Sequence, residues 1–482
     1  MTRDEPEHTI SLPEATTALV REGCFVGGSW IEPEHGRRFR VQDPATGETI
    51  AACADATAKT AELAVHAAAD AMPAWAALTA RRRAEVLLAW YDLLTEHREA
   101  LAALMTAEQG KPLAESLAEV DYGASFVRWF AEEAPRIAGE ILASPSDGRR
   151  LLTLRQPVGV VSAITPWNFP VAMITRKVAP ALAAGCAAVV KPAEDTPLCA
   201  LALAELAQQA GVPDGVLNVV TSSEPAEVGR VLATHPLVRK LTFTGSTRVG
   251  THLLELAAGT VKRTSMELGG NAPLIVFDDA DLDRAVNGAI ASRFRNGGQT
   301  CICTNRLLVH DSVQDAFVSR FVECVRALRV GPGTEPGVDI GPMISKSAAD
   351  RLTELHAETV AAGATELLDR PAFEGPGSFV APSVLVDAEP SMRIFREEIF
   401  GPIAVVYRFA DEAAAVRLAN ETDAGLASYI YTADAARQWR VAEALEYGMV
   451  GVNEVAITGD AVPFGGIKQS GLGREGSTHG ID

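Results

Sequence analysis

The chain has 482 residues, of which 48% are hydrophobic and 22% are charged, as in a globular protein and unlike a disordered one. Its 62 acidic and 43 basic side chains give a net charge of −19, which argues against general binding of nucleic acid or of anionic membranes.

The N-terminus has neither the apolar core of a signal peptide nor an Arg-rich amphipathic pattern. The longest apolar run, residues 178–190, is too short to span a bilayer. Seven scattered cysteines suit reduced thiols better than a disulfide framework. These features together predict a cytoplasmic protein.

The first predicted elements are helical. Thr79 is a suitable N-cap, and apolar residues recur after it at helical spacing, from Val86 to Leu94. The sequence Gly110-Lys111-Pro112 stops this pattern. The pattern is typical of a packing helix, and we assign no chemistry to it.

Short β-branched runs follow at intervals of roughly 25 residues, as expected for βαβ units. The runs are Val158–Ile164, Ala187–Lys191, Val216–Val220, Lys240–Thr244 and Lys262–Glu267, with helical stretches such as Leu198–Ala210 between them. This alternation predicts a parallel sheet that is covered on both faces and binds ligands at the carboxyl ends of its strands. The segments to search for function are therefore Thr165–Pro170, Lys191–Pro197, Gly245–Gly250 and Glu267–Asn271.

A second αβ pattern predicts a second α/β domain. Its predicted strands are Ala272–Phe277, Arg306–His310, Ile403–Tyr407 and Met449–Asn453. A Gly/Pro-rich crossing from Gly331 to Pro342 lies within it and is typical of a surface loop.

Three side chains in or near these loops are candidates for catalysis. Cys301 follows a Gly-Gly turn, where a thiolate can attack a carbonyl carbon, although a loop cysteine without a role fits equally well. Glu267 ends a predicted strand beside two glycines. It is either a general base or an acidic residue exposed in a turn. Asn168 lies in a turn fixed by two prolines and suits an oxyanion donor or a structural amide.

Two further segments are candidates for cofactor binding. The segment Gly245–Gly250 follows a strand and opens a helix, where backbone N–H groups suit a phosphate, but it lacks the G-x-G-x-x-G fingerprint. Glu194 ends the turn after the second strand, where a carboxylate holds a ribose diol or is simply solvated.

The order of these motifs closely resembles the NAD(P)-dependent aldehyde dehydrogenase superfamily over nearly the whole chain. The motifs are Thr165-Pro-Trp-Asn-Phe-Pro170, Lys191-Pro-Ala-Glu194, Phe243-Thr-Gly-Ser-Thr247, Glu267-Leu-Gly-Gly270, Gly298-Gln-Thr-Cys301 and Glu397-Glu-Ile-Phe-Gly-Pro402. The resemblance implies an α/β fold with a variant Rossmann cofactor domain, an α/β catalytic domain and a small β oligomerisation element. We place these at residues 1–129 with 153–267, at 268–460, and at 130–152 with 461–482.

The resemblance also implies roles for individual residues. Cys301 is then the nucleophile and Glu267 the base, with Asn168 and the Cys301 N–H in the oxyanion hole and Lys177 also in the catalytic set. The positions that match cofactor contacts are Trp167, Lys191, Glu194, Gly245, Ser246, Leu268, Glu398 and Phe400. No metal is implied, and no His/Cys cluster at zinc spacing is visible.

Within the superfamily the chain is most similar to the succinate-semialdehyde dehydrogenases. In that group, arginines matching Arg176 and Arg295 grip the substrate carboxylate, and a guanidinium fork suits such a group. Phe464 matches another substrate contact, and Thr458 stands where the group has serine. This substitution leaves glutarate or 2-oxoglutarate semialdehyde open as alternatives.

Two other kinds of relative are alternatives to this activity. A CoA-acylating dehydrogenase needs no deacylating base, and a non-enzymatic relative is expected to lose Cys301 or Glu267. Both residues are present in this chain, which favours the hydrolytic enzyme.

Three expectations concern regulation, cofactor choice and assembly. Cys303 lies two residues from Cys301, and some relatives use such a pair as a labile redox switch. A carboxylate at Glu194 favours NAD over NADP by repelling a 2′-phosphate, with NADP still possible. We expect a homodimer or homotetramer, with both states open because relatives usually extend beyond the position of Asp482.

Overall fold

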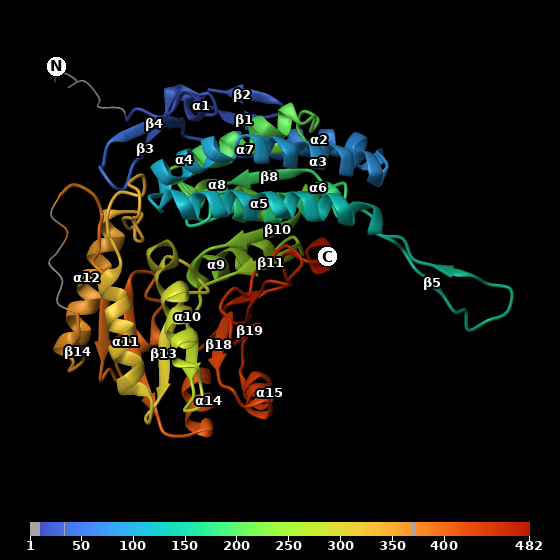
Figure 1. The fold of residues 1–482 in the computed structure, drawn as a ribbon. Coiled ribbons are helices and arrows are strands. Elements are labelled where there is room, and N and C mark those ends of the chain that lie inside the picture. Colours follow the sequence, from blue (N-terminus) through green and yellow to red (C-terminus); the bar gives the residue numbers. More distant parts are fainter. Residues whose placement is uncertain (1–9, 33, 369–372, 374) are drawn as a thin grey trace, which may run out of the picture.

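The structure, a computed structural model, describes residues 10–32, 34–368, 373 and 375–482. Figure 1 shows two α/β units with a two-stranded arm that extends from the first. Residues 1–9 of the predicted cofactor domain lie outside the described residues.

Within the described residues, the first sheet has eight strands in the order β2-β1-β9-β8-β7-β10-β11-β21. Their bounds are β1 Cys24–Val26, β2 Ser29–Ile31, β7 Val160–Ile164, β8 Ala188–Lys191, β9 Leu217–Val219, β10 Val238–Thr244, β11 Arg263–Glu267 and β21 Gly471–Leu472. The strands from β9 through β8, β7 and β10 to β11 are parallel, and the chain order reverses between β7 and β10. Ligands of such sheets bind outside the carboxyl ends of the strands at this reversal.

Helices cover both faces of this sheet, as predicted. Consecutive residues of one strand, such as Ala163 and Ile164, belong to different apolar clusters, because successive side chains of a strand point to opposite faces of the sheet. One cluster includes α3 Ala80–Glu96, α4 Arg98–Gln109, α5 Leu113–Glu133, α6 Ala172–Ala183 and α7 Pro197–Gln209. The other includes α2 Ala58–Ala77, α8 Pro225–Thr234 and α9 Thr247–Ala258.

The predicted helix after Thr79 is two helices. The Thr79 hydroxyl accepts the Arg82 N–H at 3.3 Å and caps α3 as expected. His97 has φ −93° and ψ 17°, outside the helical region, and separates α3 from α4. Gly110 then ends α4 in the left-handed region, at φ 91°.

The second sheet has seven strands among the described residues, in the order β14-β15-β16-β13-β12-β18-β19. Their bounds are β12 Ala272–Val276, β13 Thr304–His310, β14 Thr365–Glu366, β15 Ser383–Val386, β16 Ile403–Phe409, β18 Ala427–Tyr431 and β19 Met449–Val452. One apolar cluster packs α10 Leu282–Phe294 and α11 Gln314–Ala327 on this sheet, and another packs α12 Lys346–Ala361, α13 Arg393–Arg396, α14 Glu412–Asn420 and α15 Ala435–Ala444. Three strands of this sheet were not predicted from the sequence, namely β14, β15 and β18, and neither were β1, β2 and β21 of the first sheet.

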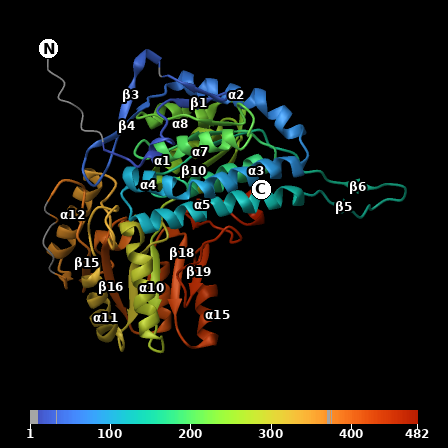
Figure 2. The ribbon, with the colours of Figure 1, turned by 45° about the horizontal axis from the view of Figure 1, so that its top comes forward.

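Smaller elements complete the described fold. They are α1 Glu14–Thr17, the pair β3 Arg38–Gln42 and β4 Thr49–Ala54, the pair β17 Ala424–Gly425 and β20 Ile467–Lys468, and the 3-10 turns η1 Glu34–Gly36, η2 Ala134–Arg136, η3 Arg295–Gly298 and η4 Thr478–Ile481. The arm consists of β5 Ile141–Leu142 and β6 Leu151–Leu152, and Figure 2 shows it extending away from the body of the molecule.

The C-terminal tail returns to the first unit, where β21 pairs antiparallel with β11 at the edge of the first sheet. The domain boundaries given above remain predictions. No helix in the described part of the chain combines the length and the apolar character needed to cross a membrane.

Candidate active site

Eight of the residues singled out from the sequence line one cleft of about 300 Å³. They come from the loops after β7, β10 and β11 and from two loops of the second unit, and they are Trp167, Asn168, Gly245, Ser246, Leu268, Cys301, Glu398 and Phe400. The strand ends therefore meet as the parallel topology predicts.

Cys301 lies at the end of a tightly turned loop. Asn296, Gly297 and Gly298 have φ values of 51°, 61° and 79°, and a Cβ at Gly298 would lie 2.4 Å from the Gly401 carbonyl oxygen. Beyond the cysteine, the Tyr429 hydroxyl donates to the Ile302 carbonyl at 2.7 Å. The loop backbone is thus held on both sides of a half-buried sulfur.

The Cys301 sulfur is a protonated thiol near neutral pH. Burial raises its pKa to about 12, with Glu398 and Glu267 adding to the shift and Arg176 opposing it. A nearby base must therefore take the proton before the sulfur can act as a nucleophile.

Asn168 is tied to the cysteine loop. Its Nδ2 donates to the Gln299 carbonyl at 2.9 Å, and Asn296 Nδ2 donates to the Asn168 carbonyl at 3.0 Å. Its Oδ1 is buried and has no hydrogen-bond partner among the described residues. The amide is therefore fixed at the edge of the cleft and close to Cys301 in space.

Glu267 is buried without a partner. Its side chain ends β11, the residue is 1% exposed, and neither carboxylate oxygen has a hydrogen-bond partner within the described part of the chain. Burial and the neighbouring Glu475 raise its pKa well above the ordinary value. A Cβ at Gly465 would lie 3.0 Å from Glu267 Oε1, so glycine leaves the carboxylate room. Such an unsatisfied acid is costly for stability and typical of functional sites.

The residue that most influences Glu267, Arg176 and Lys177 was not singled out from the sequence. Glu475 pairs with Arg176 Nε at 2.6 Å and with the Lys177 ammonium, and it accepts the Thr242 hydroxyl at 3.2 Å. These two cations hold the pKa of Glu475 down, at about 2. The sequence signal that could have pointed to Glu475 is the adjacent pair Arg176 and Lys177, because two neighbouring cations that are buried need an acidic partner.

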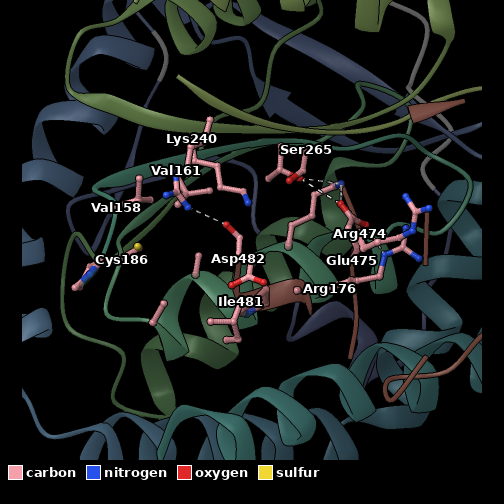
Figure 3. A pocket seen from close by; sticks show the side chains of 18 of the residues that line it. Val158, Val161, Arg176, Cys186, Lys240, Ser265, Arg474, Glu475, Ile481 and Asp482 are labelled. Atoms are coloured by element: carbon pink, nitrogen blue, oxygen red, sulfur yellow. Dashed lines mark hydrogen bonds and ion pairs between the residues drawn. The ribbon is translucent and has the colours of Figure 1, made fainter. Parts of the chain in front are cut away.

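Arg176 is less available than the sequence suggested. It is 1% exposed, it is paired with Glu475, and its Cζ lies 4.2 Å from the centre of the Phe464 ring. Figure 3 shows Arg176 and Glu475 together on the wall of a polar cavity of about 90 Å³.

Arg295 differs from Arg176 in exposure and pairing. It is exposed, its Cζ lies 5.1 Å from the Phe169 ring, and it forms no ion pair with any described residue. Thr458 is half-buried between β19 and β20, and no hydrogen bond in the described structure joins it to either arginine. The structure thus brings Arg176 and Phe464 together.

The remaining cleft residues form a surface that suits a phosphate and a flat ring. The Ser246 side chain accepts the Val249 N–H at 3.4 Å and caps α9, whose N-terminus faces the cleft. The rings of Trp167 and Phe400 meet edge to face at 5.5 Å. Thr244 also lines the cleft, and its buried hydroxyl has no partner among the described residues.

Of the other predicted cofactor contacts, Glu398 lines this cleft, whereas Glu194 lines a separate pocket and Lys191 is not among the cleft residues. Glu398 Oε1 accepts the Gly270 N–H at 2.9 Å, and burial raises the pKa of Glu398 to about 7. Buried Lys191 donates to Glu194 at 3.0 Å after β8.

A sequence model described as the aldehyde dehydrogenase family matches residues 30–482. The chain belongs to the aldehyde dehydrogenase family. It is 51% identical to the succinate-semialdehyde dehydrogenase [NADP(+)] of Escherichia coli (strain K12), and also 51% identical to a glutarate-semialdehyde dehydrogenase of Pseudomonas aeruginosa. Each alignment covers 96% of both chains.

A solved structure gives the same result. The crystal structure of succinate-semialdehyde dehydrogenase from Burkholderia pseudomallei matches with a TM-score of 0.95 and 51% identity, covering 96% of each chain. The predicted family and α/β fold are confirmed, and the protein is an NAD(P)-dependent aldehyde dehydrogenase. The roles of individual residues remain predictions.

The cleft of this aldehyde dehydrogenase fits NAD(P). The N-terminus of α9 suits a phosphate, the Thr244 hydroxyl, which lacks a partner among the described residues, suits a polar ring substituent, and Glu398 offers oxygens for ribose hydroxyls. Across the described residues, no group of three His, Cys, Asp or Glu side chains is arranged to hold a metal ion.

Proposed function

We propose that this enzyme oxidises succinic semialdehyde to the dicarboxylate by way of a Cys301 thioester. The observation that carries the proposal is the guanidinium of Arg295, which is exposed, stacked on Phe169 and not neutralised by a described ion pair. It lies next to the turn that presents Asn168, so it can hold the carboxylate of a substrate whose aldehyde reaches Cys301. The relatives at 51% identity that are named for semialdehydes support this choice.

The first step forms a bond between Cys301 and the aldehyde carbon. Glu267, which lacks a partner, takes the thiol proton, and its raised pKa makes the ionised form a strong base. The carbonyl oxygen becomes an oxyanion, which the Asn168 amide and the Cys301 N–H stabilise.

Bound NAD(P)+ supplies the hydride acceptor, so that oxidation leaves a thioester on Cys301. Phe400 would contact the nicotinamide ring and Glu398 its ribose, while Ser246, Trp167 and the α9 N-terminus would lie near the pyrophosphate. Gly245 and Leu268 would complete the wall.

Hydrolysis of the thioester then returns the enzyme to its starting state. Glu267 first releases the thiol proton to solvent. It then takes a proton from water, the hydroxide adds to the thioester carbon, and the carbon–sulfur bond breaks. The acid leaves and Cys301 regains its proton. We assign Lys177 to this set because its ammonium holds the Glu475 carboxylate beside Glu267.

The substrate assignment is tested with variants of both arginines. Arg295→Ala should lower kcat/KM for succinic semialdehyde by about 10- to 100-fold, since a charge-assisted hydrogen bond contributes about 1.5–3 kcal/mol. The same variant should change kcat/KM for butanal, which lacks the carboxylate, by less than about threefold. Equal losses for both aldehydes would sink the proposal.

Arg176→Ala has a different expected signature. Since Arg176 is paired with Glu475, its loss leaves that buried carboxylate with one cation and should lower thermal stability as well as activity.

Phe464 and Thr458 are proposed as further residues that line the substrate site.

Glutarate semialdehyde is the second candidate substrate, because a relative named for it is equally identical at 51%. Its longer chain requires the loop around Thr458 to leave more room. Comparing kcat/KM for the two semialdehydes decides between them.

NAD is the proposed cofactor and NADP the alternative. A 2′-phosphate bound beside Glu194 would be repelled, although Lys191 neutralises part of the Glu194 charge. Initial rates should give a higher kcat/KM with NAD, and Glu194→Ser should raise the NADP value. A wild-type preference for NADP would contradict this assignment.

The proposed assembly is a homodimer or homotetramer that uses the arm. Ile141, Leu152 and Leu154 on or beside the arm strands are 80%, 64% and 79% exposed, and a second copy of the chain would cover them. Ile141→Asp with Leu152→Asp should reduce the mass measured by light scattering, whereas Leu63→Asp on α2 should not. The described cysteines are all free thiols, which supports a reducing compartment such as the cytoplasm.

A further inference from the structure

The turn between α4 and α5, which the sequence analysis treated only as a helix stop, lies against the active site. Lys111 follows Gly110 in this turn and is 2% exposed. Its Nζ donates to Glu119 Oε2 at 2.5 Å and to the carbonyl oxygen of Asn168 at 2.7 Å. The residue proposed to stabilise the oxyanion is therefore held through its backbone by a buried ammonium.

Glu119 extends the same contact to α6. Its other oxygen, Oε1, accepts the N–H groups of Val171 at 3.0 Å and Ala172 at 3.3 Å. These N–H groups begin α6, where a negative charge is favoured by the helix dipole. Arg176 and Lys177 lie one turn further along this helix. One ion pair thus fixes both ends of the segment from Asn168 to the start of α6.

The Lys111–Glu119 pair is expensive to bury. Both side chains are 1% exposed, and a buried ion pair seldom stabilises a fold more than apolar residues of similar volume. Among the described residues, the other side-chain hydrogen bonds of Lys111 and Glu119 go to the backbone of the catalytic turn and of the start of α6. Lys111 Nζ also lies 4.1 Å from the centre of the Phe169 ring, the residue that follows Asn168.

We propose that Lys111 and Glu119 are positioning residues for the Asn168 amide. By holding the Asn168 carbonyl, Lys111 fixes the peptide plane from which the side chain departs, and Glu119 fixes the other end of the turn. The amide then meets the developing oxyanion without reorganisation, which is the condition under which such donors accelerate a reaction. This inference rests on the oxyanion role proposed for Asn168.

A double-mutant cycle tests the coupling. The variant Lys111→Met with Glu119→Gln removes both charges together, and Gln keeps an oxygen for the α6 N–H groups. It should lower kcat at least about tenfold, with KM for the aldehyde changed far less. Asn168→Ala alone should lower kcat by about 10²–10³-fold. Adding the pair substitution to Asn168→Ala should cost less than about twofold more, because the group that the pair positions is already gone.

Arg83→Met is the matched control. Arg83 is another buried cation that donates to backbone carbonyls, those of Leu78 and Ala183, but Ala183 is at the far end of α6. Loss of Arg83 should lower thermal stability. Its effect on kcat should be independent of Asn168, so that the fold-loss of the combined variant equals the product of the two single fold-losses. If the double variant is not folded, Glu119→Gln alone enters the same cycle.

The outcomes separate the two proposals. Full kcat in the pair variant, or losses that multiply with Asn168→Ala, would overturn the positioning role alone. Unchanged kcat in Asn168→Ala would overturn the oxyanion role and the positioning role together. Melting temperatures with and without NAD show for every variant whether the folded protein is being compared.

Discussion

Two neighbouring carboxyl groups of the active site have opposite charge preferences. Burial raises the pKa of both Glu267 and Glu475, but Glu475 is paired with Arg176 and Lys177, and its pKa falls to about 2. The same Glu475 charge helps to raise the pKa of Glu267. A proton shared between the two carboxyl groups therefore resides on Glu267. Once Glu267 ionises, its carboxylate is a base of high proton affinity beside Cys301.

The rate of thioester hydrolysis should rise with pH around and above neutrality. Only ionised Glu267 can take a proton from water, and its pKa is raised, so alkaline pH increases the active fraction. Glu267→Gln should slow both the burst of NADH formation and steady-state turnover, by about 10²-fold or more, because the same carboxylate takes the thiol proton and activates water. Stopped-flow absorbance between pH 6 and 9 measures both phases.

Exposed Glu443→Gln is the control for this substitution and should leave both phases unchanged. A normal steady-state rate in Glu267→Gln would remove Glu267 from the mechanism.

Peroxide should inactivate the enzyme reversibly through Cys303. The Cys303 thiol is 5% exposed and donates to the carbonyls of Ser292 at 2.8 Å and Arg293 at 3.0 Å, so a bond to Cys301 must break these contacts. The strained product should be reduced readily. We expect loss of two thiols and full recovery with dithiothreitol, measured by thiol titration and activity.

In Cys303→Ala the recovery should be lost, whereas Cys324→Ala should behave as the wild type. Loss of a single thiol, or recovery in Cys303→Ala, would exclude the Cys301–Cys303 pair.

At the scale of elements, strand ends and helix starts place the site. The predicted strands of the first sheet agree with the structure within two residues, because β-branched runs and turn residues mark strands locally. The break at His97, the strands β14, β15 and β18, and the edge strands β1, β2 and β21 were missed, since local patterns there resemble neighbouring helix or loop. Helix α7 shows a further tertiary effect, because its N-terminus is capped by Glu108 of α4.

Glu108 should make the stability of the fold decrease as pH rises from 4.5 to about 7 and level off above this range. It is fully buried, accepts the Leu198 and Cys199 N–H groups at 2.8 and 2.9 Å, and has its pKa raised from 4.5 to about 7. Between these two values the unfolded chain is ionised and the folded chain is protonated, so folding is progressively penalised with rising pH, by about 3 kcal/mol in full.

Glu108→Gln should remove this pH dependence. Denaturant unfolding at pH 5, 6, 7 and 8 gives the comparison, with exposed Glu99→Gln at the start of α4 as control. Identical pH slopes in Glu108→Gln and in the wild type would contradict the shift.

At the scale of the whole molecule, the C-terminal tail joins the two units. Strand β21 completes the edge of the first sheet, and Glu475 follows it into the interior to neutralise two cations of α6. The net charge of −19 is therefore a poor guide to the site, where buried arginine and lysine gather around one carboxylate.

Glu475→Gln should destabilise the whole fold. Removing one partner of a buried ion pair costs about 3–5 kcal/mol, because the remaining charges stay buried. The pKa of Glu475 is lowered from 4.5 to about 2, so its contribution is present above pH 4.5 and is lost as pH falls toward 2. Urea unfolding at pH 7 should show the loss, whereas Glu443→Gln should stay within about 0.5 kcal/mol of the wild type.

The sequence by itself determined the family, the alternation of strands and helices, and the loops that carry Cys301, Glu267 and Asn168, because these depend on residues close together in the chain. Only the tertiary structure decided how the charges are paired. Lys177 and Glu475 are 298 positions apart, and Lys111 reaches the Asn168 carbonyl across 57 positions. Since Coulomb energy depends on distance and burial in space, local patterns identify the reacting groups but not the partners that set their charge and position.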